Sequence, residues 1–417
     1  MNPEIKRRIE QIRRGDVPEE YKKAIVGIIP DSWEPKKLKD ICEINPPRKK
    51  KKSAQTIFLG MSDVDDSGHI IAQHKMDIHQ IKSGLTPFER GDILVAKITP
   101  CFENGKGANT KTLQTETGFG STEFHVLRNK KDGDFIFYHT ISHSFRQKLE
   151  REMTGSAGQK RVQVDSLGNY VIPFPGRSER RSIVDILSAQ DSIIVLKEKR
   201  LAENQQQKKY IMQQLLTGKR RLPGFEGVWK YIPAREIFKS ITDKKHSGDL
   251  QVLSSTQDRG IVPRDQVGID IKYEADSLSS YKKVEKGNFV ISLRSFQGGI
   301  EYSDYTGIVS PAYTVLKSIE KISDEYYKQF FKSTDYINRL NIAVYGIRDG
   351  KQISYEDFGR IKIPYPALDE QIAIAKVLST ADRENDLLRQ DIEQEKQKKK
   401  ALMQLLLTGI VRVTPCH

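Results

Sequence analysis

The stretch "QKKYIMQQLLTG" at residues 207–218 returns as "QKKKALMQLLLTG" at residues 397–409. Each copy closes a polar segment of about 40 residues in which apolar residues recur at helical spacing. In the first segment these are Ile183, Leu187, Ile194, Leu201, Ile211 and Leu215, and in the second Ile374, Leu378, Leu388, Ile392, Leu402 and Leu406. The repeat therefore predicts two similar long helices, each at the end of one half of the chain.

The likeness extends upstream of these helices. Trp33 and Gly91 recur as Trp229 and Gly287, 196 positions later (229 − 33, 287 − 91). Nearer the helices the offset is 191: Pro173, Glu179 and Asp191 match Pro364, Glu370 and Asp382. The offset changes between Gly91 and Pro173, so the middle of each half tolerates a change in length. Variable middles of this kind commonly carry recognition, although a duplication that only stabilises the fold remains the alternative.

Each half begins with a globular unit whose sequence favours strands. Runs such as "TIFLGM", "GDILVAKI" and "EFHVL" are separated by turn residues, and "GNFVISLRS" and "AYTVL" have the corresponding places in the second half. We therefore expect an α+β protein with two strand-rich mixed α/β units. The predicted segments are an N-terminal amphipathic segment (1–28), globular units at 29–175 and 222–366, and long helices at 176–221 and 367–417, the last with a C-terminal tail.

The two long helices carry narrow apolar stripes, each interrupted by a polar stretch at 203–209 or 393–400. A narrow stripe favours pairing with another helix over burial in a core. We expect the helices to pair with each other as an antiparallel coiled-coil spacer, a rod of roughly 60 Å. Ser178 and Asp369 are the predicted N-caps of helices that begin at Glu179 and Glu370, and Gly218 and Gly409 are the predicted left-handed stops.

Composition narrows the class of protein. The 417 residues carry a formal charge of +14, the hydrophobic content is 37%, and no apolar run is long enough to cross a bilayer. A basic chain of this kind most often meets a polyanion, so nucleic acid is the leading partner. Cys42, Cys101 and Cys416 lack metal-site spacing, as do His69, His74 and His79. We expect a soluble, cytoplasmic protein without a metal site or a membrane segment.

Searches for catalytic motifs give negative results. Asn45, Pro46 and Pro47 resemble part of an amino-methyltransferase motif, but Arg48 stands where the aromatic residue belongs. The stretch Gly346–Gln352 has the wrong glycine spacing for a phosphate-binding loop, and Gln352 replaces the required hydroxyl residue. The chain is therefore predicted to bind without catalysing a reaction.

Candidate DNA contacts lie in two pairs of equivalent loops. Glycine permits close approach of the backbone, Lys and Arg meet phosphates, and Gln and Arg make bidentate contacts to base edges. A solvated surface is the alternative for these residues, above all for the charge run 48–52. The candidates are Arg48, Lys49, Lys97, Thr99, Gln159, Lys160 and Arg161 in the first half and Arg294, Ser295, Gln297, Arg348, Lys351 and Gln352 in the second.

The duplicated plan, with "IPFPGRSERRSIVDILSAQD" and "LLTGKRRLPGF" in the first half and "IPYPALDEQIAIAKVLSTAD" and "LLLTG" in the second, resembles the specificity subunit of type I restriction-modification enzymes. The resemblance covers essentially the whole chain. It is strong over the helices and weak in the middles of the globular units. One departure is that Glu370 and Gln371 correspond to Glu179 and Arg180, so a contact made by Gln371 need not recur in the first half.

The resemblance implies a function for each part. The globular units would be target recognition domains that read the two halves of a split, asymmetric site in double-stranded DNA, and the helices would be the spacer. The chain itself would not be an enzyme. It would recruit two methyltransferase subunits and the motor-nuclease subunits, and S-adenosylmethionine, ATP and Mg²⁺ would bind to those partners rather than to this chain.

Partner helices need an apolar surface. The residues expected to offer one are Ile211, Leu215, Leu216, Leu402, Leu406 and Leu407, with packing inside the rod as the alternative. The N-terminal segment is expected beside the end of the second long helix. Two other functions stay open: a self-contained enzyme that modifies or nicks DNA, and a helical adaptor that binds only protein.

Overall fold

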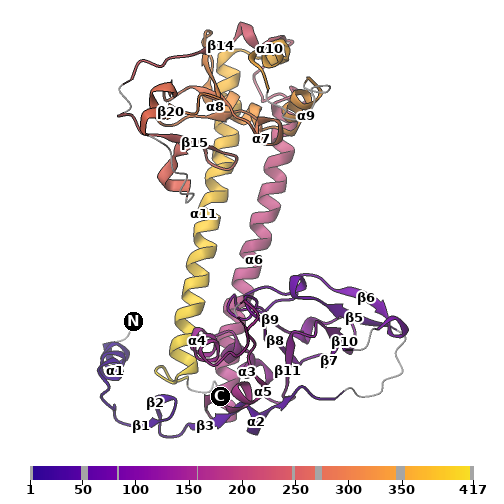
Figure 1. Cartoon of the computed structure of the whole chain (residues 1–417), viewed down its shortest axis with the longest axis vertical. Coiled ribbons are helices and arrows are strands. Elements are labelled where there is room, and N and C mark those ends of the chain that lie inside the picture. Colours follow the sequence, from indigo (N-terminus) through magenta and orange to yellow (C-terminus); the bar gives the residue numbers. More distant parts are fainter. Residues whose placement is uncertain are drawn as a thin grey trace. The chain divides into compact units, whose positions relative to one another are not determined.

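The structure is a computed structural model that describes residues 3–47, 55–81, 84–156, 158–246, 249–267, 275–343 and 353–413. The chain forms two compact units. Unit 1 consists of Met1–Leu196 and Ile392–His417, and unit 2 consists of Lys197–Asp391. Figure 1 follows the course of the chain through both units.

Two long helices, α6 (Arg177–Leu215) and α11 (Leu368–Leu407), each contribute residues to both units. Both begin two residues earlier than predicted, because the first backbone bonds run from Arg180 to the carbonyl of Gly176 and from Gln371 to that of Ala367. Ser178 and Asp369 therefore lie in the first turns and are not N-caps. The predicted stops are confirmed, since Gly218 and Gly409 have φ angles of +68° and +73°.

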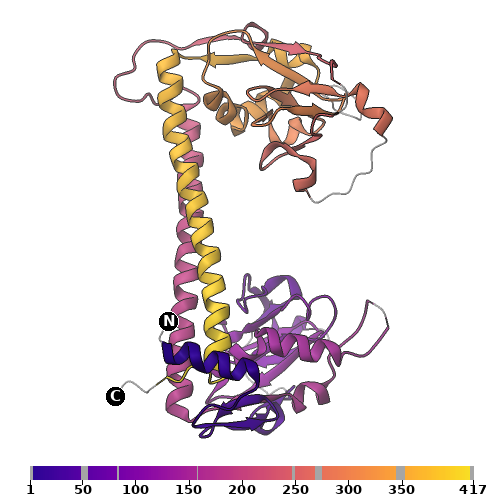
Figure 2. The same cartoon turned by 90° about the vertical axis from the view of Figure 1, so that its left-hand side faces the viewer.

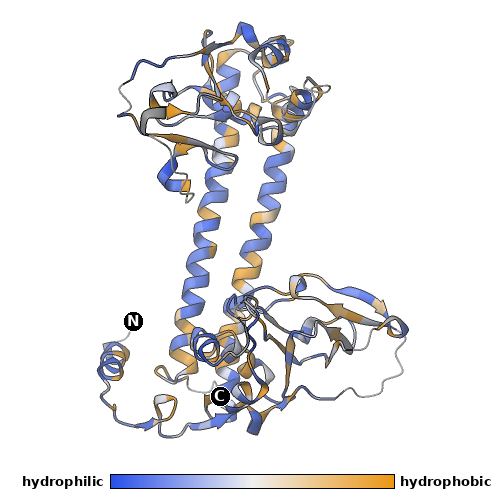
Figure 3. Ribbon diagram, viewed as in Figure 1, coloured by the Kyte–Doolittle hydropathy of each residue, from blue (hydrophilic) through white to orange (hydrophobic). Residues whose placement is uncertain are grey.

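Within each unit the segments of α6 and α11 run antiparallel. In unit 1, Gln190 of α6 donates to the Glu395 carboxylate of α11 at 2.7 Å, and Glu179 meets Arg412 just beyond the end of α11. In unit 2, Lys197 lies 2.8 Å from Asp391 and Lys208 contacts Asp382. Figure 3 shows both helices as mainly polar with scattered apolar positions, as their narrow stripes predict.

Unit 1 is built around two four-stranded sheets, with strand orders β6-β5-β10-β7 and β4-β11-β8-β9, and a two-stranded sheet of β12 and β3. β10 is parallel to β5, whereas β11 is antiparallel to β8. The strands are β1 (Tyr21–Ala24), β2 (Gly27–Pro30), β3 (Glu34–Lys37), β4 (Glu43–Ile44), β5 (Gln55–Leu59), β6 (His74–Asp77), β7 (Thr86–Glu89), β8 (Ile93–Ala96), β9 (Gly107–Asn109), β10 (Thr117–Gly120), β11 (Phe124–Arg128) and β12 (Val171–Phe174).

Four short helices of unit 1 lie in the globular part: α2 (Leu38–Ile41), α3 (Gly133–Thr140), α4 (His143–Arg151) and α5 (Val164–Asn169). Phe135 of α3 and Phe145 of α4 share one apolar core with Leu187 of α6 and with Leu406 and Leu407 of α11. The globular part and both long helices therefore bury a common core, which accounts for much of the stability of the unit.

The N-terminal helix α1 (Pro3–Arg14) follows the prediction. It ends at Gly15, whose φ is +84°, and Arg8 donates to the carbonyl of Ile410 at 3.3 Å. Tyr21 of β1 donates to the carbonyl of Gly409 at 2.8 Å. The expected position beside the end of α11 is confirmed by these bonds, and Figure 2 shows α1 there in indigo.

Unit 2 repeats the plan of unit 1. Its sheet β14-β21-β18-β19 corresponds to β4-β11-β8-β9, and three strand pairs, β15-β16, β17-β20 and β13-β22, complete the unit. The strands are β13 (Lys230–Pro233), β14 (Phe238–Ile241), β15 (Leu253–Thr256), β16 (Gly260–Pro263), β17 (Lys282–Val284), β18 (Phe289–Ile291), β19 (Glu301–Tyr302), β20 (Gly307–Val309), β21 (Thr314–Ser318) and β22 (Lys362–Tyr365).

The helices of unit 2 are α7 (Ser295–Gly298), α8 (Asp324–Phe331), α9 (Thr334–Ala343) and α10 (Tyr355–Arg360). Its core joins Phe330 and Phe331 of α8 to Leu215 and Leu216 at the end of α6 and to Ile374 and Leu378 of α11. The predicted α+β class, with two similar strand-rich units and two long helices, is confirmed.

Candidate nucleic-acid interface

The same three-residue cluster anchors each globular part on the long helices. In unit 1 the indole Nε1 of Trp33 donates to Glu179 at 2.9 Å, and Arg412 binds the same carboxylate at 2.7 and 3.0 Å. In unit 2 Trp229 donates to Glu370 at 2.9 Å. Arg221 makes two contacts with the same carboxylate, one of them at 2.7 Å. Each Arg follows the glycine that ends the other repeat's helix by three positions, so each unit needs residues from both repeats.

The first repeat has Arg180 where the second repeat has Gln371, and each of these side chains attaches its helix to the globular part of its own unit. Gln371 accepts from the backbone N–H of Ser323 and donates to the carbonyl of Pro366, both at 2.9 Å. Arg180 instead donates to the Asp132 carboxylate at 2.9 Å and to the carbonyl of Pro175. Asp132 and Ser323 are 191 positions apart (323 − 132). The same attachment is therefore made by an ion pair in unit 1 and by an amide in unit 2.

The candidate residues of unit 1 that the structure describes come together just beyond the end of β8, a strand of the sheet β4-β11-β8-β9. The backbone N–H of Thr99 donates to the carbonyl of Lys160 at 3.0 Å, and that of Val162 donates to the carbonyl of Lys97 at 2.9 Å. The side chains of Gln159 and Lys160 are exposed, whereas those of Lys97 and Thr99 are half-buried. The segment after β8 and the loop before α5 therefore present one continuous polar surface.

The side chains of Arg161 and Thr99 are less accessible to a ligand than the rest of this group. The Arg161 guanidinium binds Glu123 through Nε at 3.1 Å and Nη2 at 3.0 Å. The Oγ1 atom of Thr99 is buried and has no hydrogen-bond partner among the described residues. Gln159 and Lys160 are thus the side chains of the loop most accessible to a ligand.

His125, which the sequence argument did not single out, holds three segments of this surface together. Its Nε2 lies 2.8 Å from the carbonyl of Val162, and its Nδ1 lies 3.2 Å from the amide nitrogen of Asn45. Asn45 also accepts from the backbone N–H of Val126 at 2.9 Å and has a left-handed φ of +49°. Burial lowers the pKa of His125, so the neutral ring is favoured. A histidine in the middle of the apolar strand "EFHVL" is the signal that could have identified it.

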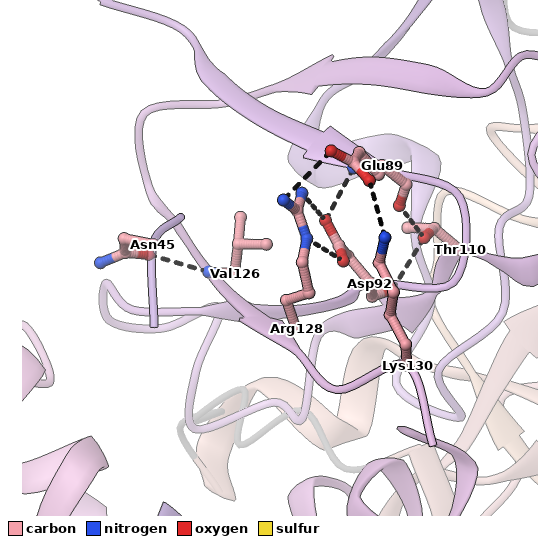
Figure 4. A network of polar contacts seen from close by, with 7 residues as sticks. All are labelled: Asn45, Glu89, Asp92, Thr110, Val126, Arg128 and Lys130. Carbon is pink, nitrogen blue, oxygen red and sulfur yellow. Dashed lines mark hydrogen bonds and ion pairs between the residues drawn. The ribbon is translucent and has the colours of Figure 1, made fainter. Parts of the chain in front are cut away.

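Arg128, at the end of β11, forms a buried charge network at the other end of the same strand (Figure 4). Its Nε and Nη2 lie 2.9 and 2.7 Å from the two oxygens of Asp92, and its Nη1 lies 3.1 Å from Glu89. Asp92 also accepts from the backbone N–H of Glu89 at 2.7 Å, which closes the turn before β8. The turn and two strand ends are thereby fixed together.

Among the candidates of unit 2 that fall in the described residues, two side chains are exposed and one is buried. Arg294 and Gln297 are exposed in and beside α7. Ser295 is only 1% exposed, and its Oγ accepts from the backbone N–H of Ser292 at 2.9 Å. Its side chain is therefore not available at the surface, because it closes the turn that leads into α7. Arg48, Lys49, Arg348, Lys351 and Gln352 lie outside the described residues.

Four of the six residues expected to form a partner surface at the helix ends are buried in the cores of their units. Leu215 and Leu216 are buried in the core of unit 2, and Leu406 and Leu407 in that of unit 1. Ile211 and Leu402 are partly buried against the same cores. Each helix end buries its leucines in the core of a globular part, next to the Trp–Glu–Arg cluster.

Other apolar side chains of the long helices are exposed at equivalent positions. Ile186 and Leu196 of α6 are 36% and 65% exposed, and Val377 and Leu387 of α11 are 38% and 56% exposed. Both pairs are 191 positions apart (377 − 186, 387 − 196). The duplicated exposed surface therefore lies along the helices and not at their ends.

The described residues hold neither a candidate metal site nor a candidate membrane span. No group of three or more potential ligands could hold a metal ion in that part of the chain. None of the described helices is both long enough and apolar enough to span a bilayer.

Comparison with known proteins gives concordant results. Residues 30–205 and 227–397 match the family described as type I restriction modification DNA specificity domain. The type I restriction enzyme EcoAI specificity subunit of Escherichia coli is 39% identical over 163 residues, which are 37% of this chain and 27% of that protein. The putative MjaX specificity subunit of Methanocaldococcus jannaschii is 26% identical over 430 residues, with 95% of this chain and 97% of that protein covered.

Solved structures show the same fold. A chain from a study of complex assembly and conformational transition of the type I R-M system has a TM-score of 0.60 at 18% identity, with 92% of this chain and 99% of that chain covered. The type I restriction-modification S subunit of M. genitalium has a TM-score of 0.52 at 14% identity, with 90% and 96% covered. With two matches that together span more than half of its length, the chain belongs to the type I restriction-modification DNA specificity domain family.

Proposed function

We propose that the chain is the non-catalytic specificity subunit of a type I restriction-modification system, in which each unit reads one half of a split, asymmetric DNA target. The observation that carries this proposal is the double occurrence of the specificity domain, at residues 30–205 and 227–397. Each occurrence has its own core and its own polar loop surface. Because Lys97 and Thr99 in unit 1 differ from Arg294, Ser295 and Gln297 in the equivalent segment of unit 2, two unlike half-sites are expected.

The proposed DNA contacts of unit 1 are centred on Lys97, Gln159 and Lys160, with Thr99 and Arg161 as supporting residues. Those of unit 2 are Arg294 and Gln297. Lysine suits phosphate, while glutamine and arginine suit base edges. The formal charge of +14 favours binding to a polyanion that weakens steeply as salt rises. Arg48, Lys49, Arg348, Lys351 and Gln352 extend the proposal to segments outside the described residues.

The test is selection of targets from a random DNA library by the chain in complex with its methyltransferase subunits. Gln159→Ala with Lys160→Ala should relax one half of the selected motif, and Arg294→Ala with Gln297→Ala the other half. Each lost base contact should reduce discrimination by about ten- to a hundredfold. Lys199→Ala is the matched control, because Lys199 is an exposed lysine of α6 whose ion pair is with Glu203. Selection of no split motif by the wild-type complex would refute the proposal.

Exchange of a whole recognition part is a broader test. Replacement of residues 29–175 by those of a relative should change one half of the motif and leave the other unchanged. The donor segment has to keep a tryptophan at the position of Trp33 and a donor at that of Tyr138, because these side chains bind Glu179 and Asp191 of α6. A change in both halves of the motif would contradict independent reading.

The proposed protein partners are two methyltransferase subunits, joined by the motor-nuclease subunits. The equivalent exposed positions Ile186 and Leu196 in unit 1 and Val377 and Leu387 in unit 2 favour two copies of one partner. S-adenosylmethionine, ATP and Mg²⁺ would bind to the partners, and the complex would work in the cytoplasm, where the DNA is.

Stoichiometry tests the partner proposal. Leu196→Glu and Leu387→Glu should each remove one of two methyltransferase subunits, and the two changes together should remove both, as measured by native mass spectrometry. Ile342→Glu is the control, since Ile342 is 74% exposed and belongs to α9 instead of a long helix. Two bound subunits in both single variants would exclude this surface.

The proposal that the chain is not an enzyme also has a direct test. Purified chain alone should neither methylate nor cleave DNA in the presence of S-adenosylmethionine and Mg²⁺. Methylation or nicking at stoichiometric protein would favour a self-contained enzyme instead. Absence of salt-dependent DNA binding in the full complex would favour a helical adaptor.

A further inference from the structure

A carboxylate in the middle of α6 joins three elements of unit 1. The hydroxyl of Tyr138 in α3 donates to Oδ2 of Asp191 at 2.8 Å, and Nζ of Lys399 in α11 lies 2.6 Å from Oδ1. The side chains of Asp191 and Lys399 are only 16% and 10% exposed. Burial, with the neighbouring Asp191, raises the pKa of Tyr138, so its hydroxyl stays a donor. One residue thus holds the globular part and both long helices.

Unit 2 has the same junction at the equivalent positions. Nε2 of Gln329 in α8 donates to Oδ2 of Asp382 at 2.7 Å, and Lys208 of α6 binds Oδ1 of the same carboxylate. All three pairs of positions are 191 apart (382 − 191, 399 − 208, 329 − 138). The carboxylate and the lysine are identical in the two units, whereas the third partner is a tyrosine in one and a glutamine in the other. A hydrogen-bond donor at this third position is therefore the shared feature.

The junction is distant from the cluster that anchors the start of each helix. Glu179 and Asp191 are 12 residues apart, as are Glu370 and Asp382, and at 1.5 Å per residue this is about 18 Å along the helix. A globular part held only at Glu179 could pivot about that point. A second attachment about 18 Å away opposes the pivot, because any change of angle has to break it.

A different ion pair connects the two long helices without Tyr138 or Asp191. Lys197 of α6 and Asp391 of α11 are 2.8 Å apart, and their side chains are 25% and 45% exposed. This pair joins helix to helix and supplies a natural control.

We propose that Asp191 and Asp382 are positioning residues that lock the angle of each recognition unit on its helix pair, and so determine how strictly the gap between the two half-sites is enforced. The inference rests on the proposed function. The bases in each half-site are read elsewhere, so loss of the lock should widen the range of accepted gap lengths without changing either half of the motif.

The experiment uses the full chain in complex with its methyltransferase subunits. The DNA library holds both selected half-sites, with gaps shorter and longer than the native one. Tyr138→Phe removes only the donor to Asp191, and Gln329→Met does the same in unit 2. Each should reduce discrimination against gaps that differ by one base pair about fivefold, and the two together should reduce it further, since distant changes usually add.

Three further variants make the test specific. Lys197→Ala should leave the gap profile unchanged, because it breaks a helix-to-helix pair and leaves Tyr138 and Asp191 in place. Tyr138→Gln, which introduces the donor of unit 2, should keep the wild-type profile, whereas Asp191→Asn should relax it. Thermal unfolding of every variant identifies any that fails to fold, and Tyr138→Phe, with its minimal change, then decides the outcome.

Two results would overturn the inference. One is an unchanged gap profile in Tyr138→Phe and Asp191→Asn, and the other is a change in the bases selected. A wild-type complex that selects no split motif would instead refute the proposed function, so the two failures can be told apart.

Discussion

Units 1 and 2 are alike where they meet the long helices and unlike at the ends of the equivalent strands β11 and β21. The turn before β8 has Asp92, and Arg128 binds it with both buried. The equivalent turn before β18 has Asn288, whose Oδ1 accepts from the backbone N–H of Glu285 at 2.9 Å. Lys317, at the position of Arg128, lies 3.7 Å from Glu285, and both side chains are about half exposed. The same turn is thus held by buried charge in one unit and by a neutral amide in the other.

This difference shows which parts of the repeat are constrained. The turn geometry requires only a side-chain acceptor at position 92 or 288, so the charge could change with its partner. The Trp–Glu–Arg cluster and the Asp–Lys junction occur in both units, and in each of them one carboxylate binds side chains from two other segments.

The largest expected effect is a loss of stability that differs between the two strand ends. Arg128→Met should reduce the free energy of unfolding of unit 1 by about 3–5 kcal/mol, because Asp92 and Glu89 would stay buried without a counter-charge. Lys317→Met should cost at most about 1 kcal/mol, since its pair is exposed. Urea denaturation followed by hydrogen exchange of each unit measures both. Equal losses would show that the strand ends are equivalent after all.

The anchoring clusters should behave alike in the two units. Glu179→Gln and Glu370→Gln each weaken a charge-assisted bond to arginine while the shape is kept, so each should cost about 2–3 kcal/mol. Glu370 is the more buried, 1% exposed against 7% for Glu179, and its loss should be the larger. Thermal unfolding of both variants tests this order, with Arg389→Ala on the exposed face of α11 as a control. A loss confined to one unit would contradict the shared role.

Low pH should destabilise unit 1 more than unit 2, by an amount similar to that expected for the anchoring clusters. Burial lowers the pKa of His139 to about 3, and its Nε2 has no hydrogen-bond partner among the described residues. The unfolded histidine, with a pKa of about 6.5, then binds more protons than the folded one, so the stability of unit 1 is full above pH 6.5 and falls as the pH drops. The expected loss at pH 5 is about 2 kcal/mol.

Unit 2 supplies the comparison for this prediction, because Phe330 occupies the position of His139 (330 − 139 = 191). Burial also raises the pKa of Asp324 and Glu301 in unit 2, which favours its folded state in acid. His139→Phe should remove most of the acid sensitivity of unit 1. Hydrogen exchange of α3 and α8 at pH 7 and pH 5 provides the measurement. Acid sensitivity that persists in His139→Phe would point to another group, of which buried His125 is the next candidate.

The smallest effect on stability is expected at the duplicated exposed surface. Leu196→Glu and Leu387→Glu should each change the free energy of unfolding of the isolated chain by no more than about 0.5 kcal/mol, because neither side chain is in a core. The binding of partner subunits should nevertheless be lost. A large loss of stability at one position would mean that the two surfaces are not equivalent.

Much of the fold could be predicted from the sequence because the signals were local or repeated. The two sequence offsets matched Trp33 with Trp229 and Glu179 with Glu370. In the structure, Trp33 bonds to Glu179 in unit 1 and Trp229 bonds to Glu370 in unit 2. The candidate site was less predictable. Ser295 is of a residue type that often contacts DNA, but its side chain closes a turn. His125 lies in an apolar strand, and its ring contacts two distant segments of the surface.

The sequence by itself determined the duplication, the two long helices with their glycine stops, and the basic, strand-rich character of both halves, since periodicity and repeats are written along the chain. Only the tertiary structure decided that Leu215, Leu216, Leu406 and Leu407 are core residues and that Arg412 completes the unit begun by Trp33. It also decided that Asp191 and Asp382 each join three elements. These facts depend on which side chains meet between residues that are 53 to 233 positions apart in the sequence, and local pattern carries no information on such pairings.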